Sequence, residues 1–350
     1  MKNKLGIIGV LLAVAALTFA LAGCGGSDNQ NSSSQSGSST DTTEASAILG
    51  TQDLLGGSAI TKGAKYFEEE MGIETDAINR FDAGRDIITA LSSDSADFGG
   101  PFGVVPVVVG LTSGTDYKVI YIECLIRGSE GLVVREGSGI ESVADLKGKQ
   151  VAVTSASSGH YGMMCALQDE GMTMDDIEML DMNPKDTYAA WQRGDIDAAY
   201  TWNPTLINLT HDGGKVILTV EDLLKNGHQT INFHVVRTEF AQQNPDAVKA
   251  YVRALAKGVD LYYSDKDAAF DIISEYLDVE REDAEEQMSD KYVKLADQLN
   301  DDAFGSDTAA TCMYEVAQFL KDAGQIEDAK DLQFFKDAVD TSYIEAVLAE

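Results

Sequence analysis

The stretch "AWQRGDIDAAYTWNP", residues 190–204, decides the fold because an earlier stretch, "ALSSDSADFGGP" (90–101), repeats its pattern. In each stretch an apolar residue that closes a helix precedes an aspartate, Asp97 or Asp197, by six positions. Small residues and a proline follow in both. Because an active site is rarely built twice in one chain, an element present once in each half indicates architecture rather than catalysis.

The residues of the second stretch then have ordinary structural roles. We interpret Gly194 as the glycine that ends a helix and Asp195 as an exposed turn residue. Asp197 is expected to make a local hydrogen bond where a strand begins, and Trp191 is expected in the core. A paired-carboxylate or metal site would need further ligands converging in one cleft.

Strand and helix patterns alternate on both sides of this repeat. The run "PFGVVPVVVGLTSG" (101–114) is interpreted as a helix led by Pro101, and "YKVIYIECLI" (117–126) as the strand that follows. The same alternation restarts at "QVAVTSAS" (150–157). It predicts an α/β fold with a mainly parallel sheet covered on both faces.

The N-terminus is typical of an exported lipoprotein. A charged start, a long apolar run and "LAGC" predict a signal peptide over residues 1–23 and lipidation at Cys24. Residues 24–45 hold almost nothing apolar and predict a flexible tether. We therefore expect an extracytoplasmic protein, anchored by lipid to the outer face of the cell membrane or in the periplasm.

Charge and cysteine content exclude several classes. The formal net charge of -32 argues against nucleic acid, which requires clustered Lys and Arg. Cys124, Cys165 and Cys312 are widely spaced and flanked by apolar residues, so we expect buried thiols rather than a disulfide framework. The four histidines show no paired ligand spacing, so no metal site is expected.

Several longer segments carry a resemblance to a known family. The stretches "RFDAGRDIITALSSDSADFG", "GSEGLVVREGSGIESVADLKGKQVAV", "SSGHYGMMCAL", "DTYAAWQRGDIDAAYTWNP" and "HVVRTEFAQQNPDAVKAYVRAL" resemble taurine-binding proteins of ABC importers. Those proteins belong to a wider group that binds alkanesulfonates and nitrate. The likeness runs over most of residues 47–260 and weakens toward the C-terminus.

The resemblance implies a two-lobed periplasmic-binding-protein fold of type II. Each lobe would be a mostly parallel sheet flanked by helices, with two crossover strands as hinge, near "LIRGSEG" and "INFHVV". Lobe one would comprise residues 47–125 plus 236–350, and lobe two residues 130–230. The charge-rich segment "DVEREDAEEQMSDKYVKLADQ" (278–298) is interpreted, from its composition, as a solvated helical region.

The function implied is capture of taurine or a related small sulfonate and its delivery to a membrane permease with its ATPase. The protein would be a monomer without cofactor or catalytic residue. Alternatives are another small anion (an alkanesulfonate or nitrate) and a thiamine-pyrimidine-related binding protein or enzyme. The enzyme is disfavoured because His160 and Cys165 are five residues apart, which does not bring their side chains together on a helix.

Candidate ligand residues lie where strands run into helices, since helix N-termini there present free N–H groups to anions. The segments "GTQDLLGGSA" (50–59), "FGGPFG" (98–103) and "TSASSGHYG" (154–162) meet this description, and the candidates that they supply are Gln52, Asp53, Phe102, Ser157, Ser158, His160 and Tyr161. For the two serines, simple helix capping is the alternative role.

Taurine also carries an ammonium group. Trp202 could stack on it or belong to the core, and either Asp53 or Glu130 could supply a carboxylate. Where taurine binders are expected to have an acidic residue in the hinge strand, this chain has Asn232. That departure leaves room for a sulfonate with an uncharged tail.

Overall fold

A computed structural model describes residues 47–350. The predicted signal peptide (1–23), the lipidation at Cys24 and the tether (24–45) lie outside the described residues. Among the helices in the described range, none is long and apolar enough to cross a membrane.

The first sheet is assembled from segments far apart in the sequence. Its order is β11-β4-β10-β3-β1-β2, with β1 parallel to both β2 and β3, and β10 antiparallel to β3 and β4. Four of these strands therefore run the same way, and β10 and β11 run against them. The bounds are Leu49–Thr51 (β1), Asn79–Arg80 (β2), Phe98–Gly103 (β3), Tyr117–Leu125 (β4), Ile231–Arg237 (β10) and Lys291–Tyr292 (β11).

The second sheet has the order β7-β6-β8-β5-β9. Strand β6 is parallel to β7 and β8, while β5 is antiparallel to β8 and β9. The bounds are Glu130–Arg135 (β5), Gln150–Val153 (β6), Glu178–Asp181 (β7), Ala198–Trp202 (β8) and Gly214–Thr219 (β9). Apart from the edge strand β11, each sheet thus inserts one antiparallel strand, β10 or β5, at the same place in a matching order.

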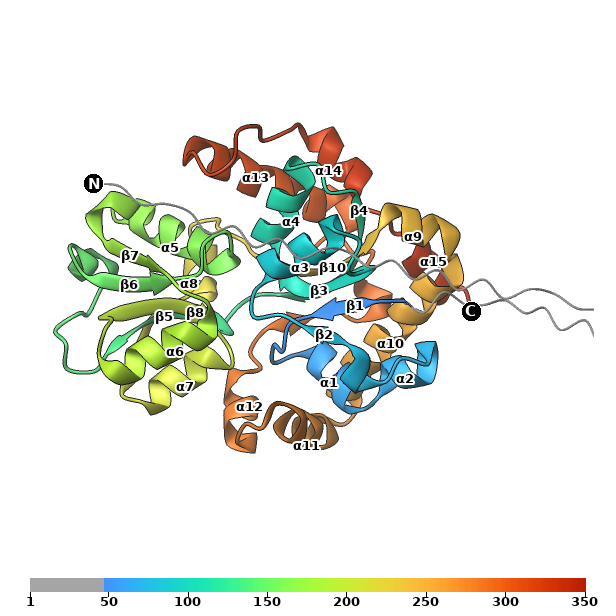
Figure 1. Cartoon of the computed structure of the whole chain (residues 1–350), viewed down its shortest axis with the longest axis horizontal. Coiled ribbons are helices and arrows are strands. Elements are labelled where there is room, and N and C mark those ends of the chain that lie inside the picture. The colour runs from blue at the N-terminus through green and yellow to red at the C-terminus, as the bar shows by residue number, and fades with distance from the viewer. Residues whose placement is uncertain (1–46) are drawn as a thin grey trace, which may run out of the picture. The chain divides into compact units, whose positions relative to one another are not determined.

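Helices cover both faces of each sheet (Figure 1). We call the elements around the first sheet the first lobe and those around the second sheet the second lobe. The first-lobe helices are α1 (Gly57–Gly63), α2 (Tyr66–Met71), α3 (Gly84–Ser92), α4 (Val104–Thr112), α9 (Thr238–Gln243), α10 (Pro245–Ser264), α11 (Lys266–Leu277), α12 (Arg281–Gln287), α13 (Thr308–Asp322), α14 (Leu332–Ala338) and α15 (Ser342–Leu348).

In the second lobe, α5 and α8 lie over one face of the sheet and α6 and α7 over the other (Figure 1). Their bounds are Ser158–Asp169 (α5), Pro184–Arg193 (α6), Thr205–His211 (α7) and Val220–Leu224 (α8). Buried apolar residues alternate along β5, with Leu132 and Val134 on one face and Val133 on the other. Short 3-10 turns occur at Thr75–Ala77, Val143–Leu146, Met174–Asp176, Leu295–Asp297 and Gly305–Asp307.

The repeat in the sequence corresponds to one structural device used twice. Asp97 accepts the N–H of Ile48 just before β1, and Asp197 accepts the N–H of Gln150 at the start of β6, both at 2.9 Å. Gly194 ends α6 with a φ of 80°, a value that favours glycine. These findings confirm the interpretation of Gly194, whereas the hydrogen bond of Asp197 is not local as expected: it reaches β6, 47 residues earlier in the chain.

Of two further expectations from the sequence, the structure confirms the burial of Trp191 and corrects the start of the helix expected at Pro101. Trp191 is 1% exposed, which confirms it as a core residue. The helix expected from Pro101 onward begins only at Val104, because β3 continues to Gly103 to complete its pairing with β10. This shift of the strand end changes the surroundings of Phe102.

Candidate ligand-binding site

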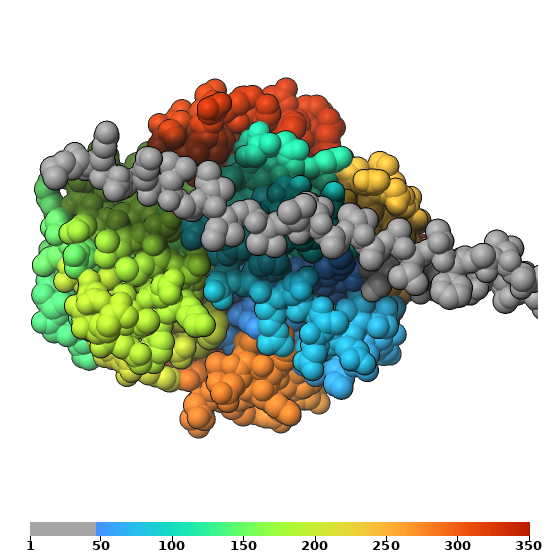
Figure 2. All heavy atoms as spheres, in the orientation of Figure 1, coloured from blue at the N-terminus to red at the C-terminus, as the bar shows by residue number. Residues whose placement is uncertain are grey.

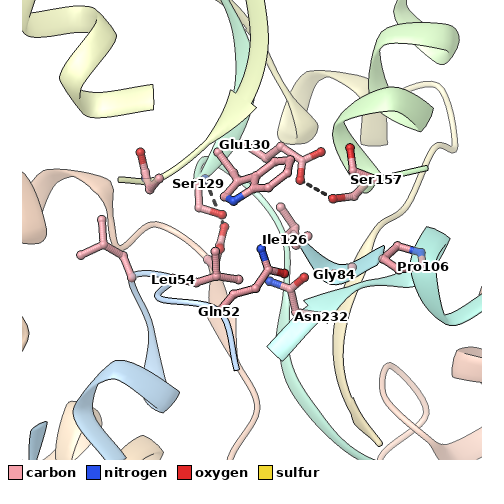
Figure 3. A pocket seen from close by; sticks show the side chains of 15 residues that line it. Gln52, Leu54, Gly84, Pro106, Ile126, Ser129, Glu130, Ser157 and Asn232 are labelled. Carbon is pink, nitrogen blue, oxygen red and sulfur yellow. Dashed lines mark hydrogen bonds between the residues drawn. The ribbon is translucent and has the colours of Figure 1, made fainter. Parts of the chain in front are cut away.

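A pocket lies between the two lobes, where the carboxyl ends of strands meet (Figure 3). The space in and around it, open solvent at its mouth included, is about 470 Å³. In Figure 3, Gln52 and Asn232 point into it from the first lobe, opposite Glu130 and Ser157. The lining residues are Gln52, Leu54, Leu55, Gly84, Gly103, Pro106, Ile126, Ser129, Glu130, Ser157, Ser158, Trp202, Asn203, Asn232 and Asp290.

Atoms of the two lobes, yellow-green and blue, meet on the face seen in Figure 2. Arg85, on α3, donates to Asn183 Oδ1 at 2.8 Å and to Asp181 at 3.2 Å, both in the second lobe. On another side, His211 Nε2 lies 3.1 Å from Asp283 Oδ1 of α12. Polar contacts therefore join the lobes at two places outside the pocket lining.

Glu130 is the most unusual residue of the lining. It is 2% exposed, and its Oε2 accepts a hydrogen bond of 2.6 Å from Ser158 Oγ. Its Oε1 is buried and has no hydrogen-bond partner among the described residues. Burial raises the pKa of this carboxyl to about 8; the Ser158 hydrogen bond opposes that rise and nearby Asp290 adds to it.

Asp290 is the second carboxyl group in the lining. It follows α12, and its Oδ1 accepts the N–H of Arg127 at 2.7 Å and of Ser129 at 3.3 Å. Those two amides belong to the segment that crosses from β4 to β5. Burial raises the pKa of Asp290, and the hydrogen bonds from the crossing segment oppose the rise. The C-terminal part of the chain therefore reaches the pocket and fixes the crossing segment.

The start of α5 supplies the serines. Ser157 is the N-cap: its Oγ accepts the N–H of His160 at 3.2 Å and donates to the Thr154 carbonyl at 2.6 Å. Its hydroxyl is thus committed to capping, although the residue also lines the pocket. Ser158 faces Gly103, where an added Cβ would lie 2.7 Å from Ser158 Oγ, so the absence of a side chain at Gly103 permits this close approach.

Amide side chains provide most of the other polar groups. Gln52 Nε2 donates to the Asp82 carbonyl at 3.3 Å, and Asn232 Nδ2 contacts Cys124 Sγ at 3.6 Å. Asn203 has a buried Oδ1 without a partner among the described residues. Trp202 ends β8 directly opposite Glu130 and is half-buried. The pocket therefore combines two carboxyl groups, amides, three serine hydroxyls and one indole.

Asp53, the other carboxylate candidate, faces a different pocket that shares Trp202 with the first. Lys62 Nζ lies 2.9 Å from its Oδ1, Arg80 lies 3.4 Å from its Oδ2, and the Tyr276 hydroxyl donates to it at 3.0 Å. Burial favours a higher pKa, but Lys62 and its other partners lower the pKa of Asp53 below its ordinary value. Asp53 is already neutralised within its own lobe.

Three other candidates do not reach the pocket lining. Phe102 is fully buried in the first-lobe core, beneath Gly84, because it lies within β3 rather than at a helix start. Tyr161 packs edge-on against Phe319 at 5.1 Å between ring centres. His160 Nδ1 accepts the Ala156 N–H at 3.4 Å, so its ring serves the local loop.

Three residues of the pocket lining, Asn203, Ser129 and Asp290, were not predicted as ligand residues from the sequence. Asn203 stands beside Trp202 in the quoted repeat, and Ser129 stands beside Glu130, so proximity to a candidate could have indicated both. Asp290 was placed in a solvated helical region. The helix there ends at Gln287, and the chain then forms β11 against β4. Tyr292 and Val293, both buried, are the local signal for that strand.

The cysteines and histidines of the described residues do not suggest nucleophilic or metal chemistry. Cys124, Cys165 and Cys312 are unpaired and buried, and burial raises the pKa of the Cys165 thiol to about 12. A thiol with so high a pKa is not a nucleophile at neutral pH. Within residues 47–350 no three His, Cys, Asp or Glu side chains are grouped so that they could hold a metal ion.

Sequence comparison places this chain beside several known proteins. The profile of the family described as NMT1/THI5 like matches residues 58–269, more than half of the chain. The taurine-binding periplasmic protein of Escherichia coli (strain K12) is 32% identical over 208 residues, an alignment that covers 59% of this chain and 63% of that protein. A Bacillus subtilis (strain 168) protein whose name describes an aliphatic sulfonates-binding protein is 29% identical over 347 residues, 97% of each chain.

Structural comparison agrees at the level of the fold. The alkanesulfonate-binding protein SsuA from Xanthomonas axonopodis pv. citri, bound to MOPS, superposes with a TM-score of 0.72 at 20% identity, over 84% of this chain and 98% of that one. The two sheets flanked by helices and this likeness confirm the expected α/β, two-lobed fold of periplasmic binding proteins. A fold alone does not fix a function, which has to be argued from the site.

Proposed function

The chain belongs to the NMT1/THI5-like family, and from this premise we propose that it is the extracytoplasmic solute-binding protein of an ABC importer. It captures a small sulfonate between its lobes and delivers it to a permease with its ATPase. Cys24, in the "LAGC" context, carries the lipid that holds it at the membrane. Relatives named for taurine and for aliphatic sulfonates support the ligand class.

Taurine is the ligand that the site supports best. The observation that carries this choice is that Glu130 and Asp290, both buried, line a pocket in which no lining residue is Lys, Arg or His. Such a pocket repels a simple anion but suits a ligand that brings its own cation. An amino sulfonate does so while its sulfonate accepts hydrogen bonds from amides and the N-terminus of α5.

Thermal unfolding of the purified protein with a panel of ligands tests this function. The panel contains taurine, isethionate (its hydroxyl analogue), short alkanesulfonates, nitrate and sulfate. A ligand in hundredfold excess over its Kd adds about 2.7 kcal/mol of stability and so raises the Tm. We expect taurine to give the largest shift. A shift with nitrate alone, or with none of the sulfonates, would contradict the proposal.

The two tryptophans of the chain allow a direct test of ligand contact. In Trp191→Phe, Trp202 is the only remaining indole, and we expect its fluorescence to change when taurine binds. Trp202→Ala should abolish the thermal response, while Trp191→Phe lowers stability because Trp191 packs on Arg135, yet keeps the response. Unchanged fluorescence, together with an intact response in Trp202→Ala, would return Trp202 to a packing role.

A further inference from the structure

Glu130 lies in the pocket lining without a cationic side chain beside it there. Its single strong contact is the 2.6 Å hydrogen bond from Ser158, which donates to one oxygen and leaves Oε1 buried with no partner in the described part of the chain. A buried carboxylate without a cation is costly, so the free pocket favours the neutral acid. The residue is therefore poised to change its charge when a cation enters.

The groups around Glu130 reinforce this conclusion. Asp290, another acid, faces Glu130 from the segment before β11. On β8 the neighbouring titratable group is Tyr200, a buried phenol. On the packed helix α5 the titratable groups His160, Tyr161 and Cys165 are buried, and burial disfavours the charged form of each. Lys215 of β9 pairs with Glu141, and His211 of α7 pairs with Asp283. Burial accordingly holds the pKa of Glu130 near 8.

We propose that Glu130 selects ligands that carry an ammonium group, and that it releases its own proton to solvent when such a ligand binds. This inference rests on the proposed function and deepens it. The O–H bond of the acid breaks, the proton passes to the buffer, and the ammonium keeps its three protons. Oε1 then accepts an N–H of the ligand, while Ser158 continues to donate to Oε2. An isethionate molecule offers no cation, so the acid remains protonated.

Opposite pH dependences follow for the two ligands. Taurine requires the carboxylate, so its affinity rises about tenfold per pH unit below the pKa of Glu130 and levels off above it. Isethionate binds beside the neutral acid, so its affinity is constant below that pKa and falls above it. Both affinities therefore change their pH dependence at the pKa of Glu130: taurine affinity rises with pH below it, and isethionate affinity falls with pH above it.

Isothermal titration calorimetry at pH 7 in phosphate and in Tris tests the proposal, because these buffers differ in their heat of protonation. The difference between the observed heats gives the number of protons exchanged. With taurine we expect release of about 0.9 proton, since a group with a pKa near 8 is mostly protonated at pH 7. With isethionate we expect a value near zero. No release with taurine, or uptake of a proton, would overturn the inference.

Variants assign the proton to its source. Glu130→Gln should bind taurine at least tenfold more weakly and release no proton, whereas the exposed control Asp195→Asn should behave as the native protein. Asp290→Asn should still release a proton; loss of release there, with release intact in Glu130→Gln, would transfer the role to Asp290. If no sulfonate gives any heat, the proposed function fails and this inference fails with it. Taurine binding without proton release removes the inference alone.

Discussion

Two buried glutamates on consecutive strands have opposite surroundings. Glu123, on β4, accepts the Ser58 N–H at 2.7 Å and the Ser58 hydroxyl at 2.9 Å, and lies 3.1 Å from His234 Nε2. Glu130, on β5, receives one hydroxyl and faces another acid. Burial favours a higher pKa at both, yet the partners of Glu123, His234 first, lower its pKa below the ordinary value.

The difference teaches how to tell a structural carboxylate from a functional one. Both side chains are nearly inaccessible, so burial does not separate them. What separates them is the number of their partners: the first is satisfied by its own fold, and the second, which lies in the pocket lining, keeps one buried acceptor without a partner among the described residues. Incomplete satisfaction of a buried polar group is the signal for a ligand.

The largest expected effect comes from breaking the satisfied glutamate. Glu123→Gln removes the charge that pairs with His234 and directs an amide toward donors, so we expect the free energy of unfolding to fall by about 3 to 5 kcal/mol. Urea unfolding at pH 7 measures this change. The same substitution at the exposed turn residue Glu136 serves as the control and should change stability little. A loss below about 1 kcal/mol at Glu123 would show that its network is dispensable.

Glu130→Gln should raise the free energy of unfolding, whereas Glu123→Gln lowers it. Because the pKa of Glu130 is raised in the folded state, the stability that this group contributes is complete below about pH 4.5 and is lost as the pH rises toward 8. The slope is at most about 1.4 kcal/mol per pH unit. The variant lacks this slope, so at pH 8 the empty protein should gain about 1 to 3 kcal/mol. Unfolding in urea from pH 5 to 9 measures both slopes, and parallel curves would contradict the prediction.

Ser158→Ala tests the one partner that Glu130 has. Losing that hydrogen bond raises the pKa of Glu130 further, so taurine should bind more weakly at pH 7 by about 1 to 2 kcal/mol. The midpoint of its pH dependence should move to higher pH. The neighbouring Ser157→Ala removes a helix cap instead, and should cost about 1 kcal/mol of stability without moving that midpoint. A common effect in both variants would mean that Ser158 also acts only through the helix.

The architecture could be predicted from the sequence because the same pattern recurs in its two halves. Asp97 and Asp197 each accept a backbone N–H at the start of a strand that lies 49 or 47 residues earlier in the chain, and Gly194 ends its helix locally. Six of the ten candidate ligand residues also line the pocket, since strand ends meet at one edge of a sheet. They are Gln52, Glu130, Ser157, Ser158, Trp202 and Asn232.

The surroundings of Asp290, Asp53 and Phe102 could not be predicted from the sequence, because they depend on contacts with other segments of the chain. Asp290 reaches the pocket because a strand of two residues, β11, pairs with β4; the apolar residues Tyr292 and Val293 indicate a strand there but not the strand that it pairs with. Asp53 is paired with Lys62 and Arg80, which only the folded loop brings to it. The burial of Phe102 depends on how far β3 continues against β10, which the partner strand determines.

The contacts of Arg85 bear on how firmly the two lobes are held together. Its acceptor Asp181 is about half exposed, and Arg85 itself is about a third exposed, so water and salt screen the pair and its net value is at most about 1 kcal/mol. Such contacts align the lobes without binding them together firmly, and the edge-on packing of Tyr161 against Phe319 also joins the lobes. Under the proposed function, a permease that separates the lobes would therefore work against this apolar contact as well as against the bound ligand.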